Sequence, residues 1–120
     1  MARNHDIGNK GEQLAKEALL KGGYQILEEN WRHEKAEIDI VAFEAGQLVF
    51  VEVKTRSRND FGEPEDFVDD LKQKHLERAS AAYIEKMEWE GEIRFDIIAV
   101  NFSEKGGPLI RHIKDAFFPA

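Results

Sequence analysis

The sequence predicts an α/β fold in which a mixed β-sheet is flanked by two helices, in the order α-β-β-β-α-β-β. Two segments with helical periodicity, one before Gly22 and one over residues 69–89, are the first observation. Five short runs rich in β-branched and aromatic residues between and after them are the second. Hydrophobic residues make up 42% and charged residues 34% of the 120 residues, which is a typical globular balance. We expect one domain over residues 1–120.

The first segment predicts a helix near the start of the chain. Its apolar and small residues recur at intervals of three and four, which places them on one helix face: Ile7, Gly11, Leu14, Ala15, Ala18 and Leu19. Gly22 and Gly23 end the pattern.

Three strands are predicted next, over residues 24–32, 36–43 and 47–54. The second and third are close enough to form a hairpin with Ala45 and Gly46 as a two-residue turn, in which Gly takes a positive φ. That turn places four residue pairs opposite each other: Phe43 and Leu48, Val41 and Phe50, Asp39 and Glu52, Glu37 and Lys54. Because side chains alternate along a strand, the polar members of these pairs are expected on one face.

A second helix over residues 69–89 and strands over residues 92–102 and 109–113 complete the predicted order. The residues expected along one side of this helix are Leu71, His75, Ala79, Ala82, Tyr83 and Lys86. Gly106, Gly107 and Pro108 turn the chain before the last strand. Asp96 stands among apolar residues, and we expect it to support the core rather than to act in catalysis.

Composition excludes several classes of protein. Cysteine is absent, so there is no disulfide framework and no thiolate metal site, which suits the cytoplasm. The apolar runs are too short to cross a bilayer, and the N-terminal residues MARNHDIGNKGE lack the apolar region of a secretory signal. The formal net charge is −7, which repels nucleic acid unless the protein offers a local basic patch or a bound cation.

Chemistry is predicted at the hairpin, where two carboxylates face each other. Asp39 and Glu52 would repel each other on an apolar face. A divalent cation turns this repulsion into ligation, since Mg²⁺ prefers one or two carboxylates together with water and phosphate oxygens. Lys54 could then hold a phosphate or orient a water, which completes the parts of metal-assisted phosphodiester hydrolysis. The alternative is a pair of solvated strand-end carboxylates, with Lys54 pairing Glu37 or Glu52.

Glu12 offers a third carboxylate. It lies at the edge of the apolar stripe of the first helix, from which it could reach toward Asp39 and Glu52. The alternative is an ordinary acidic residue near the start of a helix, where the helix dipole favours it.

Basic residues close to this region predict contacts to nucleic-acid phosphates. The candidates are Arg32, Arg56, Arg58 and Lys74. Lys72 and Arg78 on the second helix are expected to approach the same region. The alternative is a solvated surface on which cations and acids are mixed, and the four histidines show no metal-ligand spacing.

Several stretches resemble the YraN-like family of small uncharacterised bacterial proteins. They are GNKGEQLAKEALLKGGYQILEENWR, AEIDIVAF, LVFVEVKTRS and the Phe61-Gly62 pair, within residues 8–118. The resemblance implies a restriction-endonuclease-like fold of the PD-(D/E)xK superfamily, similar to archaeal Holliday-junction resolvases. It implies that Glu12, Asp39 and Glu52 bind Mg²⁺ or Mn²⁺ and that Asp39, Glu52 and Lys54 are catalytic. Ile38 stands where the superfamily motif carries Pro.

Three functions follow as hypotheses. The first is a metal-dependent nuclease acting on DNA, which we favour over RNA, with branched or end-bearing DNA as its substrate. The second is a nucleic-acid-binding or adaptor module that keeps the nuclease fold without turnover. The third is a protein-interaction domain in which the acidic cluster is incidental. A homodimer suits the first hypothesis, because a resolvase-like mechanism needs two active sites.

Overall fold

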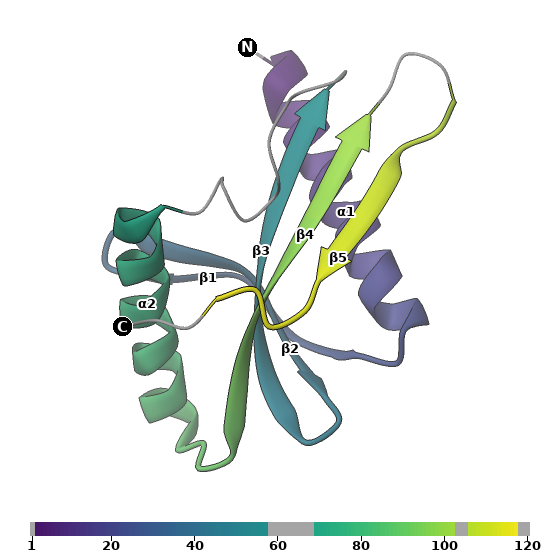
Figure 1. Ribbon diagram of the computed structural model, residues 1–120. Helices are drawn as coiled ribbons and strands as arrows, with labels where there is room; N and C mark the ends of the chain where they lie inside the picture. Colours follow the sequence, from purple (N-terminus) through teal and green to yellow (C-terminus); the bar gives the residue numbers. More distant parts are fainter. Residues whose placement is uncertain (1, 58–68, 103–105, 118–120) are drawn as a thin grey trace.

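The computed structural model describes residues 2–57, 69–102 and 106–117 (Figure 1). The elements follow the predicted order: α1 (Ala2–Lys21), β1 (Gln25–His33), β2 (Ala36–Glu44), β3 (Gln47–Ser57), α2 (Asp70–Met87), β4 (Glu92–Phe102) and β5 (Leu109–Ile113). Predicted and observed bounds agree within a few residues, and β3 is three residues longer than expected. Neither described helix is long and apolar enough to cross a membrane.

The five strands form one mixed sheet in the order β1-β2-β3-β4-β5. Neighbouring strands are antiparallel except β3 and β4, which run parallel. A parallel connection needs a crossover, and α2 lies within the segment that supplies it. The prediction of a mixed α/β sheet is therefore confirmed.

The two helices cover opposite faces of the sheet (Figure 1). On one face α1 contributes Ala15 and Leu19 to a core with Ile40, Val49 and other strand residues. On the other face α2 packs against a second core, whose buried members are Ala36, Ile38, Val41, Leu48, Phe50, Leu76, Ala79, Tyr83, Phe95 and Ile97. The centre of the sheet is thus buried on both sides. A polar side chain there costs free energy unless a hydrogen-bond or ion-pair partner offsets its burial.

The buried face of α2 agrees only in part with the predicted side. Leu71 was expected on the same side as Ala79 and Tyr83, which are buried, but it is 63% exposed. The buried residues of α2 are Leu76, Ala79, Ser80 and Tyr83, which share one face at intervals of three and four. Leu71 and Leu76 lie about 140° apart around a helix, so only one of them can face the core.

The β2–β3 hairpin has the predicted two-residue turn. Ala45 and Gly46 have φ values of 53° and 80°, which suits the turn type that matches strand twist. Phe43 pairs with Leu48 and Val41 pairs with Phe50, as expected. The ladder ends at Ile40 and Val51, so the expected backbone pairs of Asp39 with Glu52 and of Glu37 with Lys54 do not form.

Candidate functional site

The site lies where β2 separates from β3, beyond the last paired residues of the hairpin. Ile38 packs in the α2 core and Ile40 in the α1 core, so the regular alternation of side chains breaks at Asp39. The backbone N–H of Val53 donates to Asp39 Oδ2 at 2.8 Å. Because strand N–H groups point toward the neighbouring strand, the Asp39 carboxylate lies between β2 and β3 and replaces a backbone acceptor.

Glu52 is the buried carboxylate of the site, with 5% of its surface exposed. Its Oε2 lies 3.5 Å from Lys54 Nζ and 3.4 Å from Lys72 Nζ. Its Oε1 is buried without a hydrogen-bond partner in the described part of the chain. A buried carboxylate oxygen without a donor is costly, and a ligand that satisfied this oxygen would lower the cost.

The two carboxylates disfavour each other's charge. The pKa of Asp39 is raised from 3.8 to about 7, first by burial and then by the negative charge of Glu52. The hydrogen bond from Val53 and the charge of Lys72 act in the opposite direction, and Glu12 adds to the increase. Asp39 therefore keeps a proton to far higher pH than an exposed aspartate, as expected for a group next to a like charge in a buried place.

Glu12 approaches this region from α1. Burial raises its pKa first, followed by the charges of Glu37, Glu52 and Glu29. The helix can come close because residue 11 is Gly: a Cβ there would collide with the side chain of Thr55 on β3. The structure therefore places Glu12 within electrostatic reach of Asp39 and Glu52, without a direct hydrogen bond between them in the described residues.

Lys54 and Lys72 bring two positive charges to Glu52 from different elements. Lys54 follows Glu52 by two residues on β3, and the side chains of both residues lie close together as alternation predicts. Lys72 lies in the first turn of α2. Asp69 is the N-cap residue of this helix, and its side chain accepts a hydrogen bond from the Lys72 N–H at 2.9 Å. Of the two partners that the alternative interpretation offered to Lys54, the structure shows Glu52, while Glu37 lies 3.5 Å from Arg32.

The donor chemistry of this region suits a hard divalent cation. The pKa of Asp39 is raised, and Glu52 Oε1 is buried without a hydrogen-bond partner in the described residues. A bound cation would reduce the energetic cost of both features. Over residues 2–57, 69–102 and 106–117, however, no group of three His, Asp or Glu side chains is close enough to hold a metal. The fit therefore rests on the two carboxylates of Asp39 and Glu52.

The predicted phosphate-contacting residues are spread over three elements. Arg32 on β1 is highly exposed and lies 3.5 Å from Glu37. Arg56 on β3 donates to the carbonyl oxygen of Thr55 at 3.4 Å, and Lys74 is exposed on α2. Arg58 lies outside the described residues. A patch that unites these four residues therefore stays a prediction.

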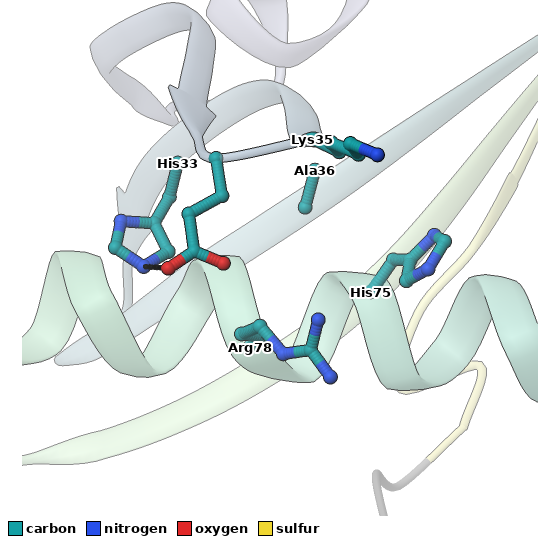
Figure 2. Close-up of a pocket in the computed structure, with 6 residues that line it drawn as sticks. His33, Lys35, Ala36, His75 and Arg78 are labelled. Atoms are coloured by element: carbon teal, nitrogen blue, oxygen red, sulfur yellow. Dashed lines mark ion pairs between the residues drawn. The ribbon is translucent and has the colours of Figure 1, made fainter.

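A pocket between the β1–β2 turn and α2 was not expected from the sequence. It is lined by His33, Glu34, Lys35, Ala36, His75 and Arg78, from the β1–β2 turn and α2 (Figure 2). The histidines show no metal-ligand spacing in the sequence, so His33 and His75 were not predicted to lie together. The helical spacing of Lys72, His75 and Arg78 was the available signal, since residues three apart share a helix face.

A second charged cluster lies around Asp96, which is fully buried. Arg94 donates to both oxygens of Asp96 at 2.8 Å, His112 lies 2.7 Å from Oδ2, and the Asp115 N–H donates at 3.0 Å. Burial acts to raise the pKa of Asp96, but these partners outweigh it and lower the pKa. With both oxygens occupied, Asp96 is a structural residue, as predicted.

Comparisons with known proteins identify relatives over almost the whole chain. Residues 11–100 match the model of a family described as "Uncharacterised protein family UPF0102". A UPF0102 protein of Christiangramia forsetii is 48% identical over 118 residues, and one of Flavobacterium psychrophilum is 50% identical over 118 residues, each alignment covering 98% of both chains. A UPF0102 protein of Bacteroides thetaiotaomicron is 44% identical over 119 residues, covering 99% of this chain and 98% of the relative. Their names state no activity.

Proposed function

The chain belongs to the uncharacterised protein family UPF0102, and we propose that it is a Mg²⁺- or Mn²⁺-dependent nuclease that hydrolyses phosphodiester bonds in DNA. The observation that carries the proposal is the buried carboxylate of Glu52. One of its oxygens faces two lysines and the other has no donor among the described residues, beside an aspartate with a strongly raised pKa. Buried, mutually repelling carboxylates are costly for stability and are typical of functional sites.

Each side chain has a role that its position supports. Asp39 and Glu52 would hold the cation, with Glu12 as the nearest further carboxylate. When bound, the cation supplies a Lewis acid and lowers the pKa of water. The Lys54 ammonium lies 3.5 Å from Glu52 Oε2, a position from which it can bind a phosphate oxygen or orient the attacking water. Lys72 offers a second positive charge from α2.

We also propose that the domain has the restriction-endonuclease-like arrangement of the PD-(D/E)xK superfamily. Three features support this assignment: a helix before the sheet, a hairpin that carries the acidic residues, and a helical crossover to a parallel strand. The aspartate lies on β2 and the Glu-x-Lys pair on β3, as the resemblance implies. Branched or end-bearing DNA is the substrate class to test first, and a homodimer stays a prediction that sedimentation of the full chain tests.

A specific observation favours a second candidate, a nucleic-acid-binding or adaptor module without turnover. In the part of the chain that the structure describes, Asp39, Glu52 and Glu12 are not close enough to form a three-carboxylate metal site. Lys54 and Lys72 also compensate the charge of Glu52 without any cation. Such a module would bind DNA with strong salt dependence and would not depend on Lys54.

The test is cleavage of branched, flapped, single-stranded and duplex DNA with Mn²⁺ or Mg²⁺. The variants are Glu52→Gln, which removes the buried charge, and Glu85→Gln, which removes an exposed charge from α2 as a matched control. We expect cleavage by the wild-type protein and by Glu85→Gln, and a loss of about 100-fold or more in Glu52→Gln. Cleavage by Glu52→Gln at the wild-type rate would overturn the assignment of the site to Glu52, and metal-dependent cleavage of none of these DNAs would favour the binding module.

A further inference from the structure

The pocket between the β1–β2 turn and α2 is separate from the carboxylate site. Figure 2 shows that its lining comes from two segments about forty residues apart in sequence, the turn with His33, Glu34 and Lys35, and the helix with His75 and Arg78. A dashed line in Figure 2 joins His33 to Glu34, where Nε2 and Oε2 lie 3.6 Å apart. None of the five polar residues takes part in the contacts of Glu52 or Asp39 described above.

The lining of the pocket is chemically suited to an anion. Lys35 and Arg78 carry positive charges and Glu34 one negative charge, so the formal sum is +1 with both histidines neutral. This sum contrasts with the net charge of −7 of the whole chain. Arg and His offer several N–H donors, and the planar guanidinium of Arg78 matches the geometry of phosphate oxygens. Glu34 is held beside His33 rather than left without a partner.

The size of the pocket restricts the ligand. Its volume is about 220 Å³. Sites for drug-sized ligands have roughly 300–1,000 Å³, so a whole nucleotide with its base would not fit. A space that holds about seven waters, at about 30 Å³ each, is suited to one phosphate group with its hydration.

The position of the pocket relates it to the carboxylate site. Lys72 contacts Glu52, and His75 and Arg78 follow it on α2 at intervals of three residues, so that Arg78 lies about 120° around the helix from Lys72. A helix rises 1.5 Å per residue, so Arg78 is about 9 Å farther along the axis than Lys72. Phosphates of one DNA strand are spaced about 3.4 Å along the duplex axis, so this distance corresponds to about one to three nucleotides.

We propose that this pocket, formed by His75, Arg78 and the β1–β2 turn, binds a phosphate group of a nucleic-acid strand whose scissile bond lies at Glu52. The inference rests on the proposed function for the identity of the strand, but the pocket itself is defined without it. The pocket supplies the local positive region that an acidic protein needs to hold DNA. The phosphate is either the 5′-terminal group of the strand or an internal phosphodiester, and the experiment below distinguishes the two.

The test measures binding of single-stranded DNA in EDTA, where metal-dependent cleavage cannot occur. The probes are 3′-fluorescent strands of about 12 nucleotides, within the size range that single-strand binders cover, with a 5′-phosphate or a 5′-hydroxyl. The variants are His75→Gln, Arg78→Gln and their combination, and Lys21→Gln on α1 is a control with the same change of charge as Arg78→Gln. Anisotropy is recorded over a salt series, and thermal melts show that each variant is folded.

We expect Arg78→Gln to weaken binding about tenfold and to reduce the salt slope by about one, with a larger loss in the double variant. A preference for the 5′-phosphate that disappears in the double variant assigns the pocket to the terminal group. Equal losses on both probes assign it to an internal phosphodiester. Binding by the double variant equal to that of Lys21→Gln would overturn the inference, even if the wild-type protein cleaves DNA. Pocket-dependent binding without any cleavage would instead overturn the nuclease and leave the pocket.

Discussion

The backbone N–H of Val53 donates a 2.8 Å hydrogen bond to the side chain of Asp39, at the point where β2 and β3 stop pairing. The carboxylate thus takes the place of a strand carbonyl and lies between the two strands. Burial first, and then the negative charge of Glu52, raise its pKa to about 7. The Asp39 carboxylate therefore lies where the pairing of β2 with β3 ends and also interacts electrostatically with Glu52.

Asp39→Asn is expected to stabilise the metal-free protein at alkaline pH. A carboxyl whose pKa rises from 3.8 to about 7 on folding binds more protons in the folded state, so stability falls as pH increases between these values. The variant lacks this loss and can still accept the Val53 hydrogen bond through its amide oxygen. We expect a gain of about 2–4 kcal/mol at pH 8, or roughly 5–15 °C in Tm. Melts in EDTA from pH 4 to pH 8 measure this gain.

The advantage of Asn at position 39 must shrink toward pH 4, because the folded carboxyl is then protonated and the unfolded one, with its ordinary pKa of 3.8, is about half protonated. A constant difference across the pH range would show that Asp39 acts through packing rather than through charge. An unchanged or lower Tm at pH 8 would favour the hypothesis of a protein-interaction domain, in which the acidic cluster is incidental.

Mn²⁺ is expected to raise the Tm of the wild-type protein but not that of Asp39→Asn. A ligand that binds only the folded state stabilises it by about 2.7 kcal/mol at a hundredfold excess over its Kd. The effect should be larger at pH 8 than at pH 6, because the cation must displace the proton that Asp39 holds below a pKa of about 7. A thermal-melt titration measures this effect, and Ca²⁺ serves as a comparison cation. An equal rise in Asp39→Asn would place the cation elsewhere.

Lys54→Ala is expected to separate catalysis from metal binding. The Lys54 ammonium lies 3.5 Å from Glu52, so its removal leaves the carboxylate ligands in place and makes the site more negative. We expect cleavage to fall by about 100-fold or more while the Mn²⁺-dependent rise in Tm is kept or increases. The matched control is Lys86→Ala, which removes a lysine of α2 that lies 4.7 Å over the Trp31 ring. Cleavage by Lys54→Ala at the wild-type rate would exclude Lys54 from the mechanism.

The hairpin was predictable from sequence because its geometry is local. Ala45 and Gly46 determine a two-residue turn, and the turn determines that Val41 faces Phe50. The same reasoning was wrong beyond Val51, because it assumed that pairing continues to Asp39. The side chain of Asp39 replaces the backbone acceptor there, and strand periodicity carries no information on such a replacement.

The remaining parts depend on contacts between distant segments. Both Leu71 and Leu76 fit an apolar stripe on α2, and only the packing of the helix on the sheet selects Leu76. The reach of Glu12 depends on the close approach of Gly11 to Thr55, 44 residues later in the chain. The pocket joins the β1–β2 turn to His75 and Arg78 with no motif in either segment. These relations come from tertiary packing, which a local pattern does not specify.

Gly11→Ala is expected to destabilise the protein and to reduce cleavage. Its Cβ would collide with the Thr55 side chain, so α1 must move away from β3 and carry Glu12 with it. Overpacking of this kind costs about 1–3 kcal/mol, more than the gain in helix propensity of about 1 kcal/mol. Gly8→Ala is the matched control, because a Cβ at Gly8 on the same helix meets no atom within 4 Å. We expect Gly8→Ala to be neutral or stabilising in a thermal melt.

A second substitution tests the cause of this loss. Thr55→Ala removes Oγ1 and Cγ2, the two atoms nearest to the new Cβ, and keeps the Cβ of residue 55 at 3.0 Å, so Gly11→Ala combined with Thr55→Ala should recover part of the stability. If the double variant stays as unstable as Gly11→Ala, the close approach of α1 to β3 is not the reason why residue 11 is Gly.

Asp96→Asn is expected to destabilise the fold with a pH dependence opposite to that of Asp39→Asn. Asp96 is fully buried and accepts from Arg94, His112 and the Asp115 N–H, so losing its charge leaves the Arg94 guanidinium poorly compensated. Breaking a buried pair in this way costs about 3–5 kcal/mol. Because folding lowers the pKa of Asp96, its contribution is present above pH 4 and is lost only as pH falls below its ordinary value of 3.8.

Melts of wild type, Asp96→Asn and the exposed control Glu90→Gln at pH 5 to pH 8 should show a constant deficit in stability for Asp96→Asn alone. Below its Tm the folded variant should cleave and bind DNA as wild type does, since Asp96 contacts neither Glu52 nor the pocket. A deficit that grows with pH, or a loss of cleavage in the folded variant, would mean that the two buried carboxylates are coupled rather than independent.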